Sequence, residues 1–192
     1  MSAAFHSPSK EPMLEVEDLS LAFGGVRAID GLSFQVMPGE VFAIIGPNGA
    51  GKTSVFNAIT RVFAPQSGRI RVAGRDMLSL KRHQVIEAGV ARTFQNIELF
   101  EGASVLDNLM LGRHRFPQGR FLAQCLRLPS VARAEAAMRE RIEDVIELLD
   151  LAAWRHAPVA GLPYGVRKVV ELARALCAEP RLLLLDEPAS GL

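Results

Sequence analysis

The sequence is poor in the features that mark secreted and membrane-spanning proteins. Its 192 residues include only two cysteines, Cys125 and Cys177, which are too few for a disulfide framework or a cysteine-rich metal site. No apolar run approaches the roughly 18 residues of a membrane-spanning helix. The first residues lack the basic region followed by an apolar stretch that a secretory signal needs. These absences predict a soluble domain in a reducing, cytosolic compartment.

Charge of one sign is scarce as well. The chain has 22 basic and 21 acidic residues, a formal charge of +1, and therefore no overall electrostatic footprint for nucleic acid. Aromatic residues make up 6% of the chain, but hydrophobic residues make up 49%, enough for one core. The local exception is the arginine-rich stretch 113–141, which is predicted to be a solvated face. The length predicts one domain, and residues 1–12 are predicted to be a mobile tail.

The hydrophobic pattern alternates between two periods. Apolar and polar residues alternate over 14–19, 32–36 and 67–74, which predicts half-buried antiparallel strands. The segments 41–45 and 182–185 are apolar throughout, which predicts strands buried on both faces, as in a parallel sheet.

Helical spacing follows in three places. Each stripe recurs at intervals of three and four residues, as one face of a helix requires. The predicted buried stripes are Val55, Phe56, Ile59 and Val62; Met138, Ile142, Val145, Ile146 and Leu149; and Val169, Leu172, Ala173 and Leu176. Strands and helices that alternate in this order predict an α/β fold.

A glycine-rich loop joins the strand predicted at 41–45 to the first helix. Its sequence fits the pattern G-x-x-x-x-G-K-[ST], with Gly46, Pro47, Asn48, Gly49, Ala50, Gly51, Lys52 and Thr53. Backbone amides at such a bend, with a helix dipole behind them, bind the phosphates of a nucleotide. Lys52 is predicted to reach the β and γ phosphates, the Thr53 hydroxyl to ligate Mg²⁺, and Ser54 to lie near the α phosphate.

An acidic pair ends the other apolar strand. Asp186 and Glu187 follow 182–185 directly. A parallel strand beside the phosphate loop would bring Asp186 next to the Mg²⁺ on Thr53, and Glu187 would polarise the attacking water. An acidic pair at a strand end is also common as a helix N-cap, so the phosphate loop is what favours the metal and base interpretation.

Together these residues resemble the ATP-binding subunits of ABC transporters over residues 13–192. The resemblance implies an α/β P-loop (RecA-like) NTPase core with an N-terminal antiparallel β subdomain and an inserted helical subdomain. It divides the chain into a nucleotide-binding core at 13–95 and 176–192 and a helical subdomain at 96–175. The landmarks that match the family, in its order, are Phe23 (adenine stacking), 46–53 (phosphate loop), Gln95 (Mg²⁺ contact and signalling), 162–166 (signature), 182–187 (acidic strand end) and 190–192.

Two departures from the family pattern stand out. The commonest signature is Leu-Ser-Gly-Gly-Gln, whereas this chain has Pro163 and Tyr164 before Gly165, and Val166 in place of glutamine. This version resembles the branched-chain amino-acid importer branch. The chain also stops shortly after the acidic strand, where the family continues with a switch histidine, so it is expected to be truncated.

The resemblance implies an ATPase that binds ATP and Mg²⁺ and powers a membrane permease. Two such subunits form a head-to-tail dimer, in which the signature residues Pro163, Tyr164 and Gly165 contact the nucleotide of the opposite subunit. The expected location is the cytoplasmic face of the membrane, with an indirect link to a solute-binding protein and no nucleic acid. Two alternatives remain: a soluble ATPase of this family that acts on nucleic acid or ribosomes, and a truncated nucleotide-binding module without turnover.

Overall fold

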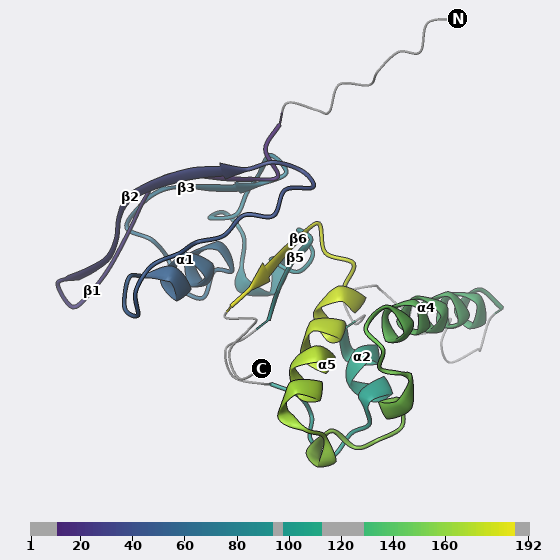
Figure 1. Ribbon diagram of the computed structural model, residues 1–192. Coiled ribbons are helices and arrows are strands. Elements are labelled where there is room, and N and C mark those ends of the chain that lie inside the picture. Colours follow the sequence, from purple (N-terminus) through teal and green to yellow (C-terminus); the bar gives the residue numbers. More distant parts are fainter. Residues whose placement is uncertain (1–10, 94–97, 113–128, 187–192) are drawn as a thin grey trace, which may run out of the picture. The chain divides into compact units, whose positions relative to one another are not determined.

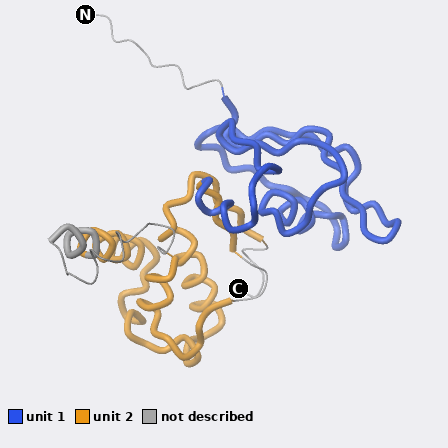
Figure 2. Tube along the Cα trace, turned by 180° about the vertical axis from the view of Figure 1, so that it is seen from behind, with its two compact units in different colours: residues 1–88 blue, residues 89–192 orange. Residues whose placement is uncertain are grey.

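The computed structural model describes residues 11–93, 98–112 and 129–186, with the backbone alone for 129–135. These residues form two compact units, residues 1–88 and 89–192, each of which is described by itself (Figure 2). Cys177 is buried and forms no disulfide within the described residues, and Cys125 lies outside them.

The first unit contains a four-stranded antiparallel sheet. Strands β1 (Leu14–Phe23), β2 (Val26–Val36), β3 (Ser67–Val72) and β4 (Arg75–Asp76) lie in the order β2-β1-β3-β4. The strands expected from alternation at 14–19, 32–36 and 67–74 are therefore confirmed. Their apolar side chains form a core on one face, including Leu14, Val16, Ile70 and Val72, all at most 3% exposed.

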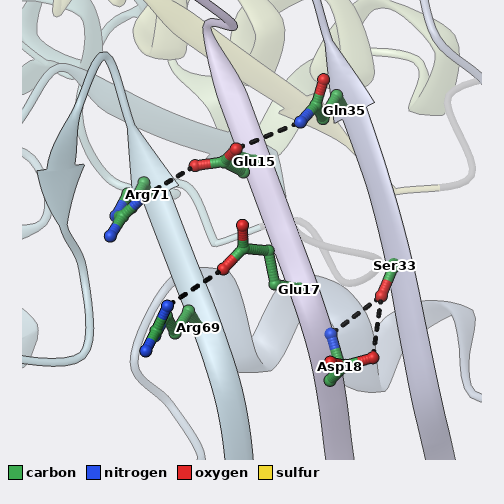
Figure 3. Close-up of polar contacts among 7 residues, drawn as sticks. All are labelled: Glu15, Glu17, Asp18, Ser33, Gln35, Arg69 and Arg71. Atoms are coloured by element: carbon green, nitrogen blue, oxygen red, sulfur yellow. Dashed lines mark hydrogen bonds and ion pairs between the residues drawn. The ribbon is translucent and has the colours of Figure 1, made fainter.

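The other face of this sheet carries a ladder of polar side chains (Figure 3). Glu15 accepts a hydrogen bond from Gln35 on β2 and pairs with Arg71 on β3. Glu17 pairs with Arg69 in the same way, at 3.6 Å. Opposite charges on neighbouring strands favour one strand register, although each exposed pair adds little stability.

An irregularity in β1 keeps its apolar residues on one face. Asp18 has a φ of 46°, and the register shifts between Val16 and Leu19 with β2 and between Glu17 and Ser20 with β3. This one-residue shift brings Leu19 back to the buried face, where it is 0% exposed. Gly68 of β3 lies against the backbone of β1 at this point. A Cβ on Gly68 would lie 2.6 Å from the Glu17 carbonyl oxygen.

Helix α1 (Lys52–Ile59) completes the first unit (Figure 1). Its buried residues are Val55, Ala58 and Ile59, so the predicted stripe is confirmed for Val55 and Ile59, whereas Phe56 is half-buried and Val62 lies beyond the helix. A short 3₁₀ helix, η1 (Arg82–Gln84), follows the sheet.

The strand predicted at 41–45 is wrong for this structure. Residues 41–45 have no assigned strand and do not belong to either sheet of the described residues. Val41 is 98% exposed and Ile45 92%. An apolar run becomes a strand only where a neighbouring backbone offers hydrogen bonds, and hydropathy does not reveal whether such a neighbour exists.

The second unit combines a short parallel sheet with helices. Strands β5 (Val90–Thr93) and β6 (Leu182–Leu185) pair in parallel, with Arg92 beside Leu184. The strand expected at 182–185 is therefore confirmed, but only Leu184 is buried, and Leu185 is 38% exposed. In the described residues β6 has a neighbour on one side only.

Three helices form the core of this unit: α2 (Val105–Gly112), α4 (Pro129–Leu148) and α5 (Tyr164–Cys177). Two 3₁₀ turns, η2 (Ala152–Trp154) and η3 (Val159–Gly161), connect α4 to α5. The stripe predicted on α4 is confirmed by burial of Met138, Ile142 and Ile146. The arginine-rich stretch falls largely outside the described residues.

The buried face of α5 is rotated from the one predicted. Its buried residues are Val170, Glu171, Ala173 and Cys177, whereas Val169, Leu172 and Leu176 are half-buried. The cause is the close approach of α2, where a Cβ on Gly112 would lie 2.3 Å from the Arg174 carbonyl oxygen. The glycine lets the two backbones meet on this side of α5.

Candidate functional site: the phosphate loop and its companions

The glycine-rich loop curls around its own lysine. Lys52 is the first residue of α1, and its Nζ donates to the carbonyl oxygens of Gly46 at 2.6 Å and Pro47 at 2.9 Å. The Ala50 amide donates to the Pro47 carbonyl at 3.1 Å, which closes the bend. The ammonium group therefore lies inside the loop, at the end of α1 where helix amides point outward.

Gly51 fixes the junction between the loop and α1. It has a φ of 86°, in the left-handed region, and it precedes the helix without a side-chain cap. A Cβ at this position would lie 2.2 Å from the carbonyl oxygen of Ala28 on β2. Both the backbone angle and the space therefore require glycine.

The remaining loop residues lie where the pattern places them. Thr53 and Ser54 are half-buried on the first turn of α1, and Asn48, Gly49 and Ala50 are exposed at the bend. The bend thus carries hydroxyl-bearing residues on the first turn of α1 and the Lys52 ammonium beside the carbonyls of Gly46 and Pro47. A glycine loop of this kind suits a polyphosphate.

Phe23 ends β1 within the same unit. Its ring is 42% exposed and meets the ring of Phe63 edge to face, with centroids 4.9 Å apart. The Gln66 side-chain amide makes two hydrogen bonds with the backbone of Ala22, the preceding residue. Phe23 is therefore a partly exposed aromatic whose strand end is held by Gln66 and whose ring packs on Phe63.

Asp186 is buried at the carboxyl end of β6 in the second unit. Its Oδ2 lies 2.7 Å from Nη2 of Arg92 on β5, and the two side chains are only 4% and 6% exposed. The Arg92 guanidinium therefore neutralises the carboxylate in its apolar surroundings. Arg92 is not among the site residues predicted from the sequence, since its partner lies 94 positions along the chain.

The signature residues lie at the N-terminus of α5. Pro163 is the N-cap, Tyr164 begins the helix and is 51% exposed, and Gly165 is half-buried. The Lys168 ammonium lies 5.8 Å from the centre of the Tyr164 ring, at cation–π distance. Glycine, an open aromatic face and free helix amides are thus presented together.

Two predicted residues, Gln95 and Glu187, lie outside the described residues. The structure brings together the loop residues 46–54 in one unit, and Asp186 and the signature residues belong to the other.

The loop suits the phosphates of a nucleotide, because it offers backbone amides and the Lys52 ammonium at the start of α1. Fold and loop together define a P-loop nucleoside triphosphatase.

Comparison with known proteins identifies the family. The family model described as "ABC transporter" matches residues 29–190. The chain is 39% identical over 94% of its length to the high-affinity branched-chain amino acid transport ATP-binding protein BraF of Pseudomonas aeruginosa, and covers 71% of it. It is 35% identical over 95% of its length to LivG of Escherichia coli, named for the same transport, and again covers 71%.

Solved structures agree. The ADP conformation of MJ1267, an ATP-binding cassette of an ABC transporter, has a TM-score of 0.79 and 31% identity, over 95% of this chain and 71% of that one. A nucleotide-free cassette has a TM-score of 0.77 and 30% identity, with the same coverage. The chain belongs to the ABC transporter family, as an ATP-binding and ATP-hydrolysing subunit. In the part of the chain that the structure describes, no helix is long and apolar enough to cross a membrane.

Proposed function

We propose that this subunit uses ATP to drive a membrane permease that imports branched-chain amino acids. The observation that carries this proposal is the phosphate loop, in which Lys52 lies inside a glycine bend at the start of α1. The similarity to BraF and LivG supports the choice of solute, because both are named for branched-chain amino acid transport.

The residues divide the work as follows. Residues 46–54 bind the phosphates, Phe23 stacks on adenine, and Thr53, Gln95 and Asp186 hold Mg²⁺, which neutralises phosphate charge when bound. Glu187 orients the attacking water. Pro163, Tyr164 and Gly165 contact the nucleotide held by a second ATP-binding subunit in a head-to-tail dimer. The permease subunits place the protein at the cytoplasmic face of the membrane, with a solute-binding protein as an indirect partner.

The phosphate loop is tested by Lys52→Ala. Removing the ammonium should weaken binding of a fluorescent ATP analogue by roughly ten- to a hundredfold, since hydrogen bonds to charged groups contribute about 1.5–3 kcal/mol. Lys81→Ala is the matched control, because Lys81 is an exposed lysine of the same unit and should leave the affinity unchanged. Equal affinities for all three proteins would contradict the site.

Turnover is tested separately by Glu187→Gln. The carboxamide cannot accept the proton of the attacking water, so phosphate release should fall at least about a hundredfold while ATP affinity is retained. Wild-type protein that binds ATP with no phosphate release would instead support a binding module without turnover.

A further inference from the structure

The segment 98–101 is held to the helices of the second unit by its backbone. Asn108 of α2, which is 0% exposed, accepts a hydrogen bond from the Phe100 amide at 2.9 Å and donates to the Phe100 carbonyl at 3.1 Å. Arg174 of α5 donates to the Glu98 carbonyl at 2.5 Å. This segment directly follows 94–97, which contain Gln95.

A second arginine of α5 grips the loop that enters the helix. Arg167 Nε donates to the Leu162 carbonyl at 3.0 Å, and Nη2 donates to the Ala160 carbonyl at 2.6 Å. Nη1 lies 3.5 Å from Glu101 Oε1. The guanidinium is 28% exposed, so its hydrogen bonds are partly shielded from water.

The loop and the segment are also joined directly. The Ala160 amide donates to the Glu101 carbonyl at 3.0 Å, and the Val159 amide donates to the Ala103 carbonyl at 3.1 Å. Both arginines lie on one face of α5, because positions seven apart are two turns apart. Arg167 therefore closes a ring of contacts from α5 through 160–162 to the turn at 101–103.

We propose that Arg167 is a positioning residue that holds Pro163, Tyr164 and Gly165 in place for the opposite subunit's nucleotide, and that ties them to the segment after Gln95. The inference rests on the proposed role of these three residues. Arg167 itself lies one turn beyond them and holds carbonyl groups of its own chain. Its planar fork suits this task, because it reaches two carbonyls and a carboxylate at fixed angles.

The contacts differ in weight. The pair with Glu101 is weak, because Glu101 is 70% exposed and the two atoms are 3.5 Å apart. The hydrogen bonds to the carbonyls of 160 and 162 are shorter, at 2.6 and 3.0 Å, and the one to Leu162 is also partly buried, so these two carry the positioning. Removing the guanidinium should therefore loosen the loop much more than neutralising Glu101.

Amide hydrogen exchange tests this without any nucleotide. Arg167→Gln should raise the exchange rates of the Ala160, Gly161 and Leu162 amides by roughly tenfold, which corresponds to the loss of one or two hydrogen bonds to a charged group. Glu101→Gln should change them by less than about threefold. Arg141→Gln, an exposed arginine of α4 in the same unit, should leave them unchanged.

The single tyrosine gives a second readout. Labelling with fluorotyrosine produces one ¹⁹F resonance, because Tyr164 is the only tyrosine of the chain. Arg167→Gln should shift or broaden this resonance. Arg167→Lys keeps the positive charge but loses the planar guanidinium. It replaces Arg167→Gln as the test variant if Arg167→Gln does not fold. It should still raise the exchange rates of the amides at 160–162. Wild-type exchange and an unchanged resonance in a folded Arg167 variant would overturn the proposal.

ATP-dependent dimerisation links the loop to function. In a Glu187→Gln background, adding Arg167→Gln should weaken dimerisation by about tenfold, measured by sedimentation at increasing ATP. If the Glu187→Gln protein binds no ATP, the proposed function fails, and the exchange measurements still decide the role of Arg167. If it dimerises equally well with and without Arg167 while exchange has risen, the link to the opposite nucleotide is wrong.

Discussion

At the scale of single residues, the site depends on positions where one side chain has no substitute. Gly51 combines a left-handed backbone with a contact distance that excludes any Cβ. Asp186 and Arg92 form an ion pair that is almost fully buried. Each feature has an exposed counterpart elsewhere in the chain. The loss of stability on substituting the buried residue can therefore be measured against the loss on substituting its counterpart.

Gly51→Ala should destabilise the protein by roughly 3 kcal/mol, since it adds a collision with the Ala28 carbonyl to the strain of a positive φ. Gly74→Ala is the control. Gly74 also has a positive φ, 76°, but a Cβ there meets nothing within 4 Å, so only the strain of about 1 kcal/mol remains. Urea unfolding of both variants measures the difference, and equal losses would contradict the close contact.

Asp186→Asn should lower the free energy of unfolding by about 3 kcal/mol, because it removes the charge that balances the buried Arg92 guanidinium. Asp30→Asn makes the same change in an exposed pair with Arg27, at 2.9 Å, where the expected loss is below about 1 kcal/mol. Both are measured by denaturant unfolding in EDTA without nucleotide. A small loss in Asp186→Asn would show that burial does not strengthen the pair.

At the scale of elements, sequence patterns predicted those whose neighbours are local. The hairpin of β1 and β2 and helices α1 and α4 follow from spacing, because their partners lie nearby in the chain or in one apolar stripe. The segment 41–45 and the face of α5 were predicted wrongly, because both depend on distant backbones. The hydropathy pattern does not show whether a segment has a neighbouring strand, nor that Gly112 contacts the backbone of α5.

The N-terminus of α2 depends on a reciprocal cap. The Ser104 hydroxyl donates to the Asp107 carboxylate at 2.6 Å and accepts from the Asp107 amide at 3.1 Å. Hydrogen bonds from the Ser104 side chain and backbone lower the pKa of Asp107 below its ordinary 3.8. The ionised carboxylate thus supports the fold above pH 3.8, and this support is lost as the pH falls through the lowered pKa.

Ser104→Ala should cost about 1 kcal/mol of stability and move the pKa of Asp107 back toward 3.8. Carboxyl NMR titration measures the pKa, and thermal unfolding measures the loss. Ser79→Ala removes an exposed hydroxyl that donates to a turn carbonyl, and should be close to neutral. An unchanged Asp107 pKa would show that the serine hydroxyl does not set it.

At the scale of the whole molecule, the loop and the signature were predictable because each is a contiguous stretch of sequence. Residues 46–54 form the predicted bend and the start of α1, although the strand expected before them is absent, and residues 163–165 stand at the start of α5. The supporting residues Arg92 and Arg167 were not predictable from the sequence. Their partners lie up to 94 and 66 positions away, respectively. Long-range ion pairs leave no periodic trace in a sequence.

The solute prediction belongs to this scale, because it concerns the assembled transporter. Deleting the gene in its host should reduce uptake of labelled leucine, isoleucine and valine, and the wild-type gene should restore it where the Lys52→Ala version does not. Sulfate uptake is the internal control, because an inorganic anion differs in chemistry from a branched-chain amino acid. Loss of sulfate uptake with normal leucine uptake would redirect the assignment.

The contact between Gly51 and Ala28 also limits how this protein can diverge. At the turn Gly24–Gly25 a Cβ would meet no atom within 4 Å, so packing does not limit this turn, although the positive φ of both residues favours glycine. Near the start of β2 there is no such space, because the Ala28 carbonyl lies against Gly51 of the phosphate loop. Substitutions that alter this sheet should therefore be placed away from Ala28, and the contact between Ala28 and Gly51 should be kept.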